Sequence, residues 1–360
     1  MHRAPSDEYK RYLPPDRISI INGYPIRIDD MVLYEVANLL PNFLMLIKLL
    51  MRWRPSCAVV VNPLLALIMR LWPLRRAPIV LDFADYYPLL LVGKDEKLPN
   101  ILRKLIVFVA KLITDLALKV CDTVVACSPG LFYYALVLRA GKETYLIPNG
   151  IEHLALMPIH GDPREKYNLC RDDFVVCYIG GLRFLDIELM VDGLRELHSS
   201  GIKVKLLVAG DGPQLPELRE RLRKEGLLAN AVFLGRVPKK EVPKVIRAAD
   251  VCIIPFRARR SFSLWLFPLK LLDYLAQCKP VISTPLYGLD EVLGREALRC
   301  VAFVLSPGEL ARAAQEFCAL MNDPSFLRCL KAVQQNILRN LAWEAVSERF
   351  CEIVYCWARA

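Results

Sequence analysis

The sequence predicts an α/β protein with two doubly wound domains, and three observations lead to this expectation. From residue 174 to residue 283, short continuous apolar runs alternate with segments of helical periodicity. This alternation is typical of parallel strands joined by crossover helices, with each strand–helix unit taking about 25–30 residues. Glycine-containing turns follow several of the runs, as at Gly180-Gly181 and Gly210-Asp211-Gly212-Pro213. The chain has 360 residues, which is too long for one ordinary core and fits two domains.

The second half of the chain has the clearer pattern. Apolar runs of strand length predict buried strands at Phe174–Ile179, Val204–Ala209, Ala231–Leu234, Val251–Pro255 and Pro280–Ser283. Apolar residues at helical spacing predict helices at Ile187–Ser199, Leu215–Glu225, Pro238–Ala249 and Leu269–Ala276. Between Pro255 and the last of these helices we expect an irregular loop.

The first half of the chain is less regular. Short apolar runs predict strands at Val59–Val61, Ile79–Leu81, Thr123–Ala126 and Thr144–Ile147, with Arg17–Asn22 as a further candidate. Helical spacing predicts helices at Leu33–Arg52, Leu98–Val120 and Gly130–Leu138. At the far end of the chain, Leu341–Cys356 contains Trp343-Glu344 followed by an amphipathic helix.

Composition restricts the class of protein. Hydrophobic residues make up 54% of the chain, yet the most apolar segments, Leu39–Met51 and Leu98–Val120, are interrupted by Lys or Arg. Neither segment is therefore expected to span a membrane, which takes about 20 nearly uncharged residues. The N-terminus is polar and contains proline, so no signal peptide is expected and a cytoplasmic chain is the default.

The charge is unevenly distributed along the chain. The net charge is +10, and residues 1–150 hold 19 Lys and Arg against 13 Asp and Glu. A basic and apolar first half suits a face that rests on anionic lipid or receives a phosphorylated lipid acceptor. A generally basic proteome would give the same balance. Nucleic acid is not an expected partner, because no basic run with interleaved aromatic residues and no known binding motif is present.

Cysteine and histidine do not predict a metal site. The 12 cysteines include no C-x-x-C pair, and several lie inside apolar strands or helices, where cysteine behaves as a small hydrophobic residue. The four histidines are scattered at His2, His153, His160 and His198.

The stretch Pro268 to Thr284, PLKLLDYLAQCKPVIST, is the strongest candidate for a binding site. Proline suits the first turn of a helix, and the free N–H groups at a helix start bind phosphate readily. Lys270 could add a positive charge for that phosphate, and Asp273 could accept hydrogen bonds from a ribose. This combination suggests a site for a nucleoside diphosphate. The alternative is an ordinary capped, amphipathic surface helix.

A second candidate feature is the glycine pair Gly180-Gly181, which directly follows a predicted strand. Glycines at this place let the backbone approach a phosphate closely, and Arg183 follows as a possible cationic partner. Such turns also occur for purely steric reasons. The loop after Gly235 could contact a base through its backbone, while the Gly-Asp-Gly-Pro sequence is more simply a tight turn.

Several motifs in order resemble the retaining glycosyltransferases of family 4, also described as glycosyl transferases group 1. These motifs are DTVVACSPGL (Asp122–Leu131), YLIPNGIE (Tyr145–Glu152), VVCYIGGLR (Val175–Arg183), KLLVAGDGP (Lys205–Pro213), AVFLGRVPKKEVPKVIRAADVCIIPF (Ala231–Phe256) and the Pro268–Thr284 stretch. The resemblance extends over roughly residues 76–350, and in the last motif Cys278 stands where a glycine is usual.

The resemblance implies a fold and a domain organisation. The fold is GT-B, with two Rossmann-like domains facing a cleft. Residues 1–150 would form an acceptor-side domain and residues 151–340 a domain that binds the nucleotide sugar. A terminal helix at about 341–360 would cross back to the first domain. The usual opening strand, glycine-rich loop and helix have no counterpart at the start of this chain, so the first domain is expected to lack its leading unit.

The resemblance also implies roles for individual residues. Lys270 and Arg183 would stabilise the leaving diphosphate. Asp85 is a third candidate catalytic residue, which would either contact the acceptor or maintain the structure of its loop. Substrate-binding positions would be Gly180, Gly181, Gly235, Pro268, Leu269 and Asp273. Reactions of this family generally need no metal, and no cofactor is expected. The expected mechanism is retaining, by front-face displacement.

Three departures from the family pattern favour an inactive protein, and the first is the absent glycine-rich loop. Trp265 occupies the place of an acid that contacts the donor sugar, and Asp186 stands near the place of a lysine, where its charge would oppose a diphosphate unless it points away. As a further departure, no histidine lies between His2 and His153, where the family often has one. The loop that includes Arg257 and Trp265 is expected over the cleft, where it could stack on sugar or base or have no function.

The resemblance therefore predicts a glycosyltransferase that acts in glycan or cell-envelope polysaccharide synthesis. It would move a sugar from a nucleoside-diphosphate sugar to a lipid-linked or saccharide acceptor at the cytoplasmic membrane face, with peripheral membrane contact. The alternative is a catalytically inactive relative that acts as a binding or assembly protein. A third and weaker reading is a sugar-nucleotide epimerase of the same fold.

Overall fold

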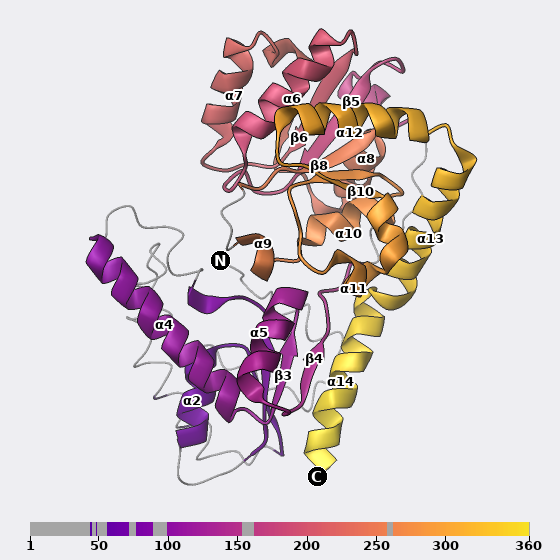
Figure 1. Cartoon of the computed structure of the whole chain (residues 1–360). Helices are drawn as coiled ribbons and strands as arrows, with labels where there is room; N and C mark the ends of the chain where they lie inside the picture. The colour runs from indigo at the N-terminus through magenta and orange to yellow at the C-terminus, as the bar shows by residue number, and fades with distance from the viewer. Residues whose placement is uncertain are drawn as a thin grey trace.

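The computed structural model describes residues 44, 48, 56–71, 77–88, 99–152, 162–257 and 262–359, and shows two α/β units that follow one another along the chain (Figure 1). The strand predicted at Arg17–Asn22 lies outside the described residues. The helix predicted at Leu33–Arg52 is described only at Leu44 and Lys48, and both are helical.

The first unit is built on a four-stranded sheet in the order β1-β2-β3-β4, and all neighbouring strands are parallel. The strands are β1 (Ala58–Val60), β2 (Ile79–Phe83), β3 (Thr123–Ala126) and β4 (Thr144–Leu146). Within the described ranges of this unit, the accompanying helices are α2 (Pro63–Leu71), α4 (Asn100–Val120) and α5 (Pro129–Arg139).

Side chains of β2 alternate between two separate cores, as the pleat of a strand requires. Ile79, Leu81 and Phe83 pack with residues of α2, α4 and α5. Val80 points to the other face and packs with Val346 of the terminal helix α14 (Trp343–Arg359). The central strands β2 and β3 are therefore buried on both faces, which explains their nearly continuous apolar sequences.

The second unit has a six-stranded parallel sheet in the order β10-β9-β8-β5-β6-β7. Its strands are β5 (Phe174–Ile179), β6 (Val204–Ala209), β7 (Ala231–Gly235), β8 (Val251–Ile254), β9 (Val281–Ser283) and β10 (Val301–Phe303). The chain order runs outward from β5 to β7, then returns to the other side of β5 and runs outward again through β8. The change of direction between β5 and β8 is the switch point of a doubly wound sheet.

The helices of the second unit cover both faces of this sheet, and all its strands pack in one large core. In chain order the helices of this part of the chain are α6 (Ile187–Ser199), α7 (Leu215–Lys224), α8 (Val242–Arg247), α9 (Phe262–Trp265), α10 (Leu269–Ala276), α11 (Leu289–Leu293), α12 (Pro307–Leu320) and α13 (Pro324–Asn340). Of these, α9 packs on α5 of the first unit. Within the described residues no helix is long and apolar enough to cross a membrane.

Two expectations about local structure need correction. The helix predicted at Pro238–Ala249 is a 3-10 turn at Lys239–Glu241 followed by the short helix α8, because Pro243 lies in the first turn of α8 and has no N–H to continue an earlier helix. The loop predicted after Pro255 contains a short helix of its own, α9.

The chain passes between the two units at two adjacent places. Ile151 and Ala342 form a parallel bridge, in which Ile151 N donates to Leu341 O at 2.8 Å and Trp343 N donates to Ile151 O at 3.2 Å. The segment that enters the second unit is thus paired with the segment that leaves it. Beyond this point α14 runs down the first unit, as Figure 1 shows, and packs on the sheet through Val346, Phe350 and Ile353.

Candidate functional site

The candidate site lies at the carboxyl ends of β5 and β8, where the strand order of the second sheet changes direction. In doubly wound sheets the crossover connections leave two such strands in opposite directions, and ligands generally bind outside the carboxyl ends of the strands at this point. Gly180 and Gly181 follow β5, and Pro255 and Phe256 follow β8. The glycine pair singled out in the sequence therefore lies at the switch point.

The turns after β5, β6 and β7 are packed against one another at this edge. Gly180 N donates to Ala209 O at 2.9 Å, and Gly210 N donates to Gly235 O at 2.7 Å. A Cβ on Gly210 would lie 1.9 Å from Gly180 O, and the φ of Gly180 is +121°. Only glycine allows this close approach and this backbone conformation. The edge therefore presents bare backbone to a ligand, with Gly235 at its far end.

Helix α10 begins beside this edge. Its N-cap is Pro268, whose side chain makes no capping hydrogen bond, and Leu269 is the first helical residue. The N–H groups of a helix start have no partner within the helix, and the helix dipole adds partial positive charge there. In this arrangement the start of α10 can accept an anion, as the sequence suggested.

Lys270 projects from the first turn of α10 toward the glycine pair. Its Nζ donates to the hydroxyl of Tyr178 at 2.8 Å and lies 4.1 Å from the centroid of the same ring. The centroid of the Phe256 ring lies 5.2 Å from Nζ. A Cβ on Gly180 would lie 2.9 Å from Nζ. The amine therefore lies against the backbone of Gly180 and near two aromatic rings.

Tyr178 fixes this arrangement. Its hydroxyl accepts from Lys270 and donates to the carbonyl of Gly181 at 2.8 Å. One side chain therefore links the amine of α10 to the glycine pair after β5. The hydroxyl donates its single proton to the carbonyl of Gly181, so toward Lys270 it acts as the acceptor.

Burial changes the protonation of Lys270. Desolvation lowers its pKa to about 7, although Asp273 acts in the opposite direction. The charged form of a buried lysine is disfavoured because it loses hydration, and a nearby anion restores it. A diphosphate placed at the start of α10 would supply that anion.

Asp273 lies one turn further along α10 and is half-buried. Burial raises its pKa to about 6, and Glu152 raises it further, while Lys239 and Lys270 lower it. Glu152 itself forms an ion pair with Lys239. Glu152 therefore brings the segment that connects the two units close to the acid predicted to contact a ribose.

Arg183, which follows the glycine pair, does not contact Lys270 or Asp273. Arg183 is exposed and makes no hydrogen bond or ion pair with any described residue. Its guanidinium is free to approach a ligand at this edge, but the structure does not bring it into contact with Lys270.

The charge of Asp186 is engaged in capping a helix. Its side chain accepts a hydrogen bond from Leu189 N at 3.1 Å as the N-cap of α6. Its own N–H donates to Pro255 O at 2.7 Å. The carboxylate is held by the start of α6, where its negative charge also interacts favourably with the helix dipole.

Asp85 lies in the first unit, two residues after β2, and is exposed. It raises the pKa of Asp82, although burial is the larger cause of that shift. Together with burial, both acids raise the pKa of Cys127 to about 12. Among the described residues no hydrogen bond links Asp85 to the second unit. Asp85 therefore belongs to a separate acidic group on the first unit.

Trp265 connects the two units. Its ring stacks on Tyr86 at 4.3 Å with an interplanar angle of 12°, and it meets the edge of Tyr134 at 5.2 Å. Its carbonyl accepts from Ser128 Oγ at 2.9 Å. The residue at the expected place of a sugar-binding acid is thus packed against the first unit.

Sequence reasoning missed three residues near the candidate site: Tyr178, Glu152 and Lys239. Tyr178 carries a recognisable signal, because it is the one polar-tipped residue in the run FVVCYI of β5. Glu152 and Lys239 carry none, since their side chains meet across 87 residues of sequence.

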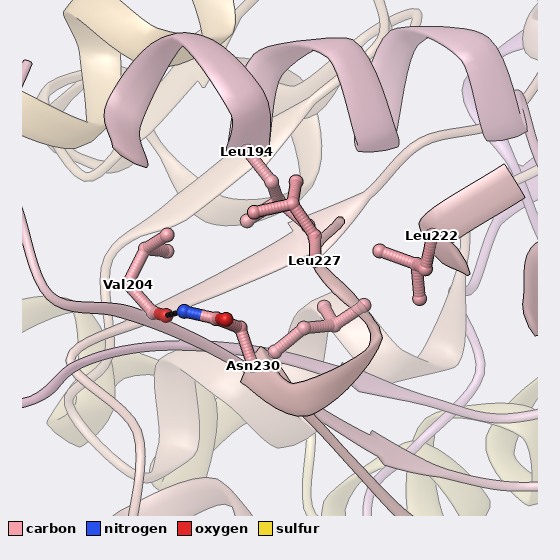
Figure 2. Close-up of a pocket in the computed structure, with 6 residues that line it drawn as sticks. Leu194, Val204, Leu222, Leu227 and Asn230 are labelled. Carbon is pink, nitrogen blue, oxygen red and sulfur yellow. Dashed lines mark hydrogen bonds between the residues drawn. The ribbon is translucent and has the colours of Figure 1, made fainter. Parts of the chain in front are cut away.

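The structure also shows a small apolar pocket elsewhere in the second unit. Its lining is mostly aliphatic, and Asn230 Nδ2 donates to Val204 O at 3.0 Å beside it (Figure 2). The lining residues come from α6, β6, α7 and the turn before β7: Leu194, Val204, Leu206, Leu222, Leu227 and Asn230. It contains no titratable group and lies inside the core, so it is a packing feature.

Comparisons with known proteins show what the second unit is similar to. Residues 173–323 match the family model described as "Glycosyl transferases group 1". A 2-deoxystreptamine glucosyltransferase of Streptomyces kanamyceticus is 27% identical over 135 residues, which is 38% of this chain and 33% of that protein. The chain thus spans about a third of the length of this relative. The residues that match the family model include the glycine pair, Lys270 and Asp273.

Solved structures extend the likeness to most of the chain. The Anabaena protein HepE in complex with UDP has a TM-score of 0.66 at 16% identity, covering 89% of this chain and 84% of that chain. Sucrose-phosphate synthase from Thermosynechococcus elongatus has a TM-score of 0.64 at 18% identity, covering 89% and 78%. The two Rossmann-like units with their parallel sheets are those of the GT-B fold.

Proposed function

We propose that this chain is a glycosyltransferase. It takes a sugar from a nucleoside-diphosphate sugar and transfers it to a lipid-linked or saccharide acceptor at the cytoplasmic membrane face, with retention of configuration. The observation that carries the proposal is the amine of Lys270, which lies against Gly180 at the switch point and beside the uncapped start of α10.

In this reaction the second unit would stabilise the leaving diphosphate. Negative charge develops on the leaving oxygen as the bond to the sugar breaks, and fixed donors aimed at that place lower the barrier. Lys270 and the N–H groups of α10 supply such donors, and Arg183 can add a second cation from the loop after the glycine pair. The bare backbone at Gly181, where a Cβ would meet nothing within 4 Å, gives the phosphates room.

The nucleoside would lie along the same edge. Asp273 is placed one turn beyond Lys270, where its carboxylate can accept from ribose hydroxyls, and the turn at Gly235 can contact the base through its backbone. The acceptor would approach from the first unit, where Asp85 and Asp82 end β2. The support for a nucleotide-sugar donor is the likeness to HepE, whose structures contain UDP and UDP-glucose.

Binding without sugar transfer is a second candidate, and Trp265 favours it. The resemblance places a sugar-contacting acid at this position, whereas Trp265 is packed on Tyr86 and Tyr134. A protein of this second kind would hold the nucleotide and release no product.

A donor assay separates the two candidates. The full chain is incubated with UDP-, GDP- and ADP-sugars and with saccharide and phospholipid acceptors, and the released nucleoside diphosphate is measured. We expect release with one base, at least about a hundredfold slower in Lys270→Ala. Lys224→Ala, an exposed lysine on α7, is the control.

Two outcomes would count against transfer. A folded wild type that binds a nucleotide but releases none supports the binding protein. Equal rates in Lys270→Ala and wild type would show that the reaction takes place elsewhere.

A further inference from the structure

The outer face of α4 is an apolar stripe that no described residue covers. Counting 100° per residue, its exposed large side chains fall within one third of the helix circumference. Their exposed fractions range from 42% to 84%, and the residues are Ile101, Leu102, Leu105, Phe108, Val109, Leu112 and Leu116. Between residues 101 and 116 the stripe runs for about 22 Å along the helix axis.

The opposite face of α4 is the one that packs on the first unit. Ala110, Thr114, Ala117 and Leu118 are buried there. A helix on the surface of a water-soluble unit normally turns charged and polar residues outward. The outer face of α4 instead carries large aliphatic and aromatic side chains, and a contiguous patch of this kind marks an interaction surface.

Positive charge borders the stripe. Of the four basic residues of the helix, Arg103 lies on the packed face, while Lys104, Lys111 and Lys119 lie beside the stripe or at its end, together with the one acid, Asp115. Lys111 pairs with Asp115, while Lys104 and Lys119 are exposed and form no ion pair with a described residue. Their long stems can follow the apolar face while the ammonium groups stay in water. The edge of the stripe is therefore suited to anions.

We propose that the outer face of α4 docks on an anionic lipid surface, with the helix parallel to the membrane plane. The inference deepens the proposed function and rests on the membrane contact included in it. Apolar side chains would enter the boundary of headgroups and acyl chains, and Lys104 and Lys119 would reach lipid phosphates. The surface belongs to the unit that carries Asp85, so it would bring the acceptor side of the protein to the membrane.

Charge is what favours lipid over a protein partner. The cores of protein–protein interfaces are depleted in lysine, and a partner protein would have to match a smooth row of aliphatic side chains. A fluid anionic bilayer accepts both features without a shaped counterpart. Two alternative occupants of the stripe are a second copy of the chain and the chain's own residues 1–43. Each of them would have to bury the same side chains, and the experiment below tests both.

Vesicle co-sedimentation of the full chain tests the proposal. Vesicles of phosphatidylcholine alone are compared with vesicles containing phosphatidylglycerol, and affinity is measured for wild type and for Leu105→Ser/Phe108→Ser. The control is Leu305→Ser, which changes a side chain that is 69% exposed outside α4. Because all three residues are exposed, we expect the variants to keep the circular dichroism and melting temperature of the wild type.

The expected result is binding to the anionic vesicles, weakened about tenfold or more by the double α4 variant and unchanged in the control. Lys104→Ala/Lys119→Ala should also weaken binding by about tenfold or more and reduce its salt dependence.

Three results would overturn the proposal. These are no vesicle binding by wild type, equal binding by the α4 variant, or a wild-type dimer that the same variant converts to a monomer. If wild type is monomeric, fails to bind vesicles and binds them once residues 1–43 are deleted, the chain's own segment is the occupant. Nucleotide binding is titrated separately, so a failure of the donor site does not alter the vesicle result.

Discussion

At the scale of single residues, the candidate site depends on how Lys270 is held. Its amine is buried near the rings of Tyr178 and Phe256 and has lost much of its hydration, which is why its pKa falls to about 7. A free lysine has a pKa of about 10.4. In the free protein the charged ammonium form of Lys270 is therefore only weakly favoured at neutral pH. An anion bound beside the amine would stabilise that charged form.

This burial predicts a pH dependence of nucleotide binding. The diphosphate favours the ammonium form, so above pH 7 the free protein must take up a proton on binding. The affinity for UDP should then fall by up to about tenfold per pH unit between pH 7.5 and pH 9. The terminal phosphate of UDP is already ionised in this range, since its pKa is about 6.

Calorimetry in buffers with different ionisation enthalpies measures the proton uptake directly. Lys270→Arg is the matched control, because arginine stays charged throughout and should make the affinity nearly independent of pH. Wild-type affinity that stays constant from pH 7.5 to pH 9 would contradict the argument.

At the scale of elements, α6 shows why a residue type alone did not identify a role. Asp186 follows the glycine pair closely in sequence and suggested a repulsive charge beside a phosphate. In the structure it is the N-cap of α6 and accepts from Leu189 N. Its role is to stabilise the helix start.

Asp186→Ala should therefore affect stability and leave ligand binding alone. Loss of the cap should lower the free energy of unfolding by about 1 kcal/mol, measured by chemical denaturation. Asp186→Ser keeps a capping oxygen and should recover most of the loss. If Asp186→Ala instead binds UDP several-fold more tightly at equal stability, the carboxylate opposes the diphosphate and the structural account of it is wrong.

The sequence predicted the strands and helices that frame the site because their signals are local. Phe174–Ile179, Ile187–Ser199, Val204–Ala209 and Leu269–Ala276 are found with the predicted bounds. The contact of Lys270 with Tyr178 could not be predicted, since it joins residues 92 positions apart. Neither could the docking of Trp265, because it depends on how the two units meet.

One departure from the family pattern is explained by backbone geometry. Cys278, which replaces an expected glycine, has a φ of +53° at the end of α10. Glycine adopts this left-handed conformation without a steric penalty, which is why it is usual at such a place. In this chain Cys278 adopts the left-handed conformation at the end of α10 although it has a side chain.

At the scale of the whole molecule, the two units are joined by more than their connecting segments. The backbone of α9 lies on the start of α5, where a Cβ on Gly130 would be 1.6 Å from Leu264 O. Trp265 then adds its stack on Tyr86 and its edge contact with Tyr134. These contacts hold the loop before α10, and therefore Lys270, at a set position relative to the first unit.

Removing this ring should loosen the two units. Trp265→Ala should lower the free energy of unfolding by about 1–3 kcal/mol, as expected for two aromatic pairs. It should also increase the radius of gyration in small-angle scattering. Trp265→Phe keeps a ring and should behave more like wild type. Unchanged scattering by Trp265→Ala would mean that the other contacts hold the units without it.

The central claim is that a nucleoside diphosphate binds at the switch point of the second sheet, against Lys270 and Asp273. Calorimetric titration of the full chain with UDP, GDP and ADP tests it most directly, with Lys270→Ala and Asp273→Ala beside wild type and Lys224→Ala as control. We predict binding of one nucleotide, weakened at least about tenfold in both site variants and unchanged in the control. Absence of binding by folded wild type, or equal affinity in all four proteins, would contradict the claim.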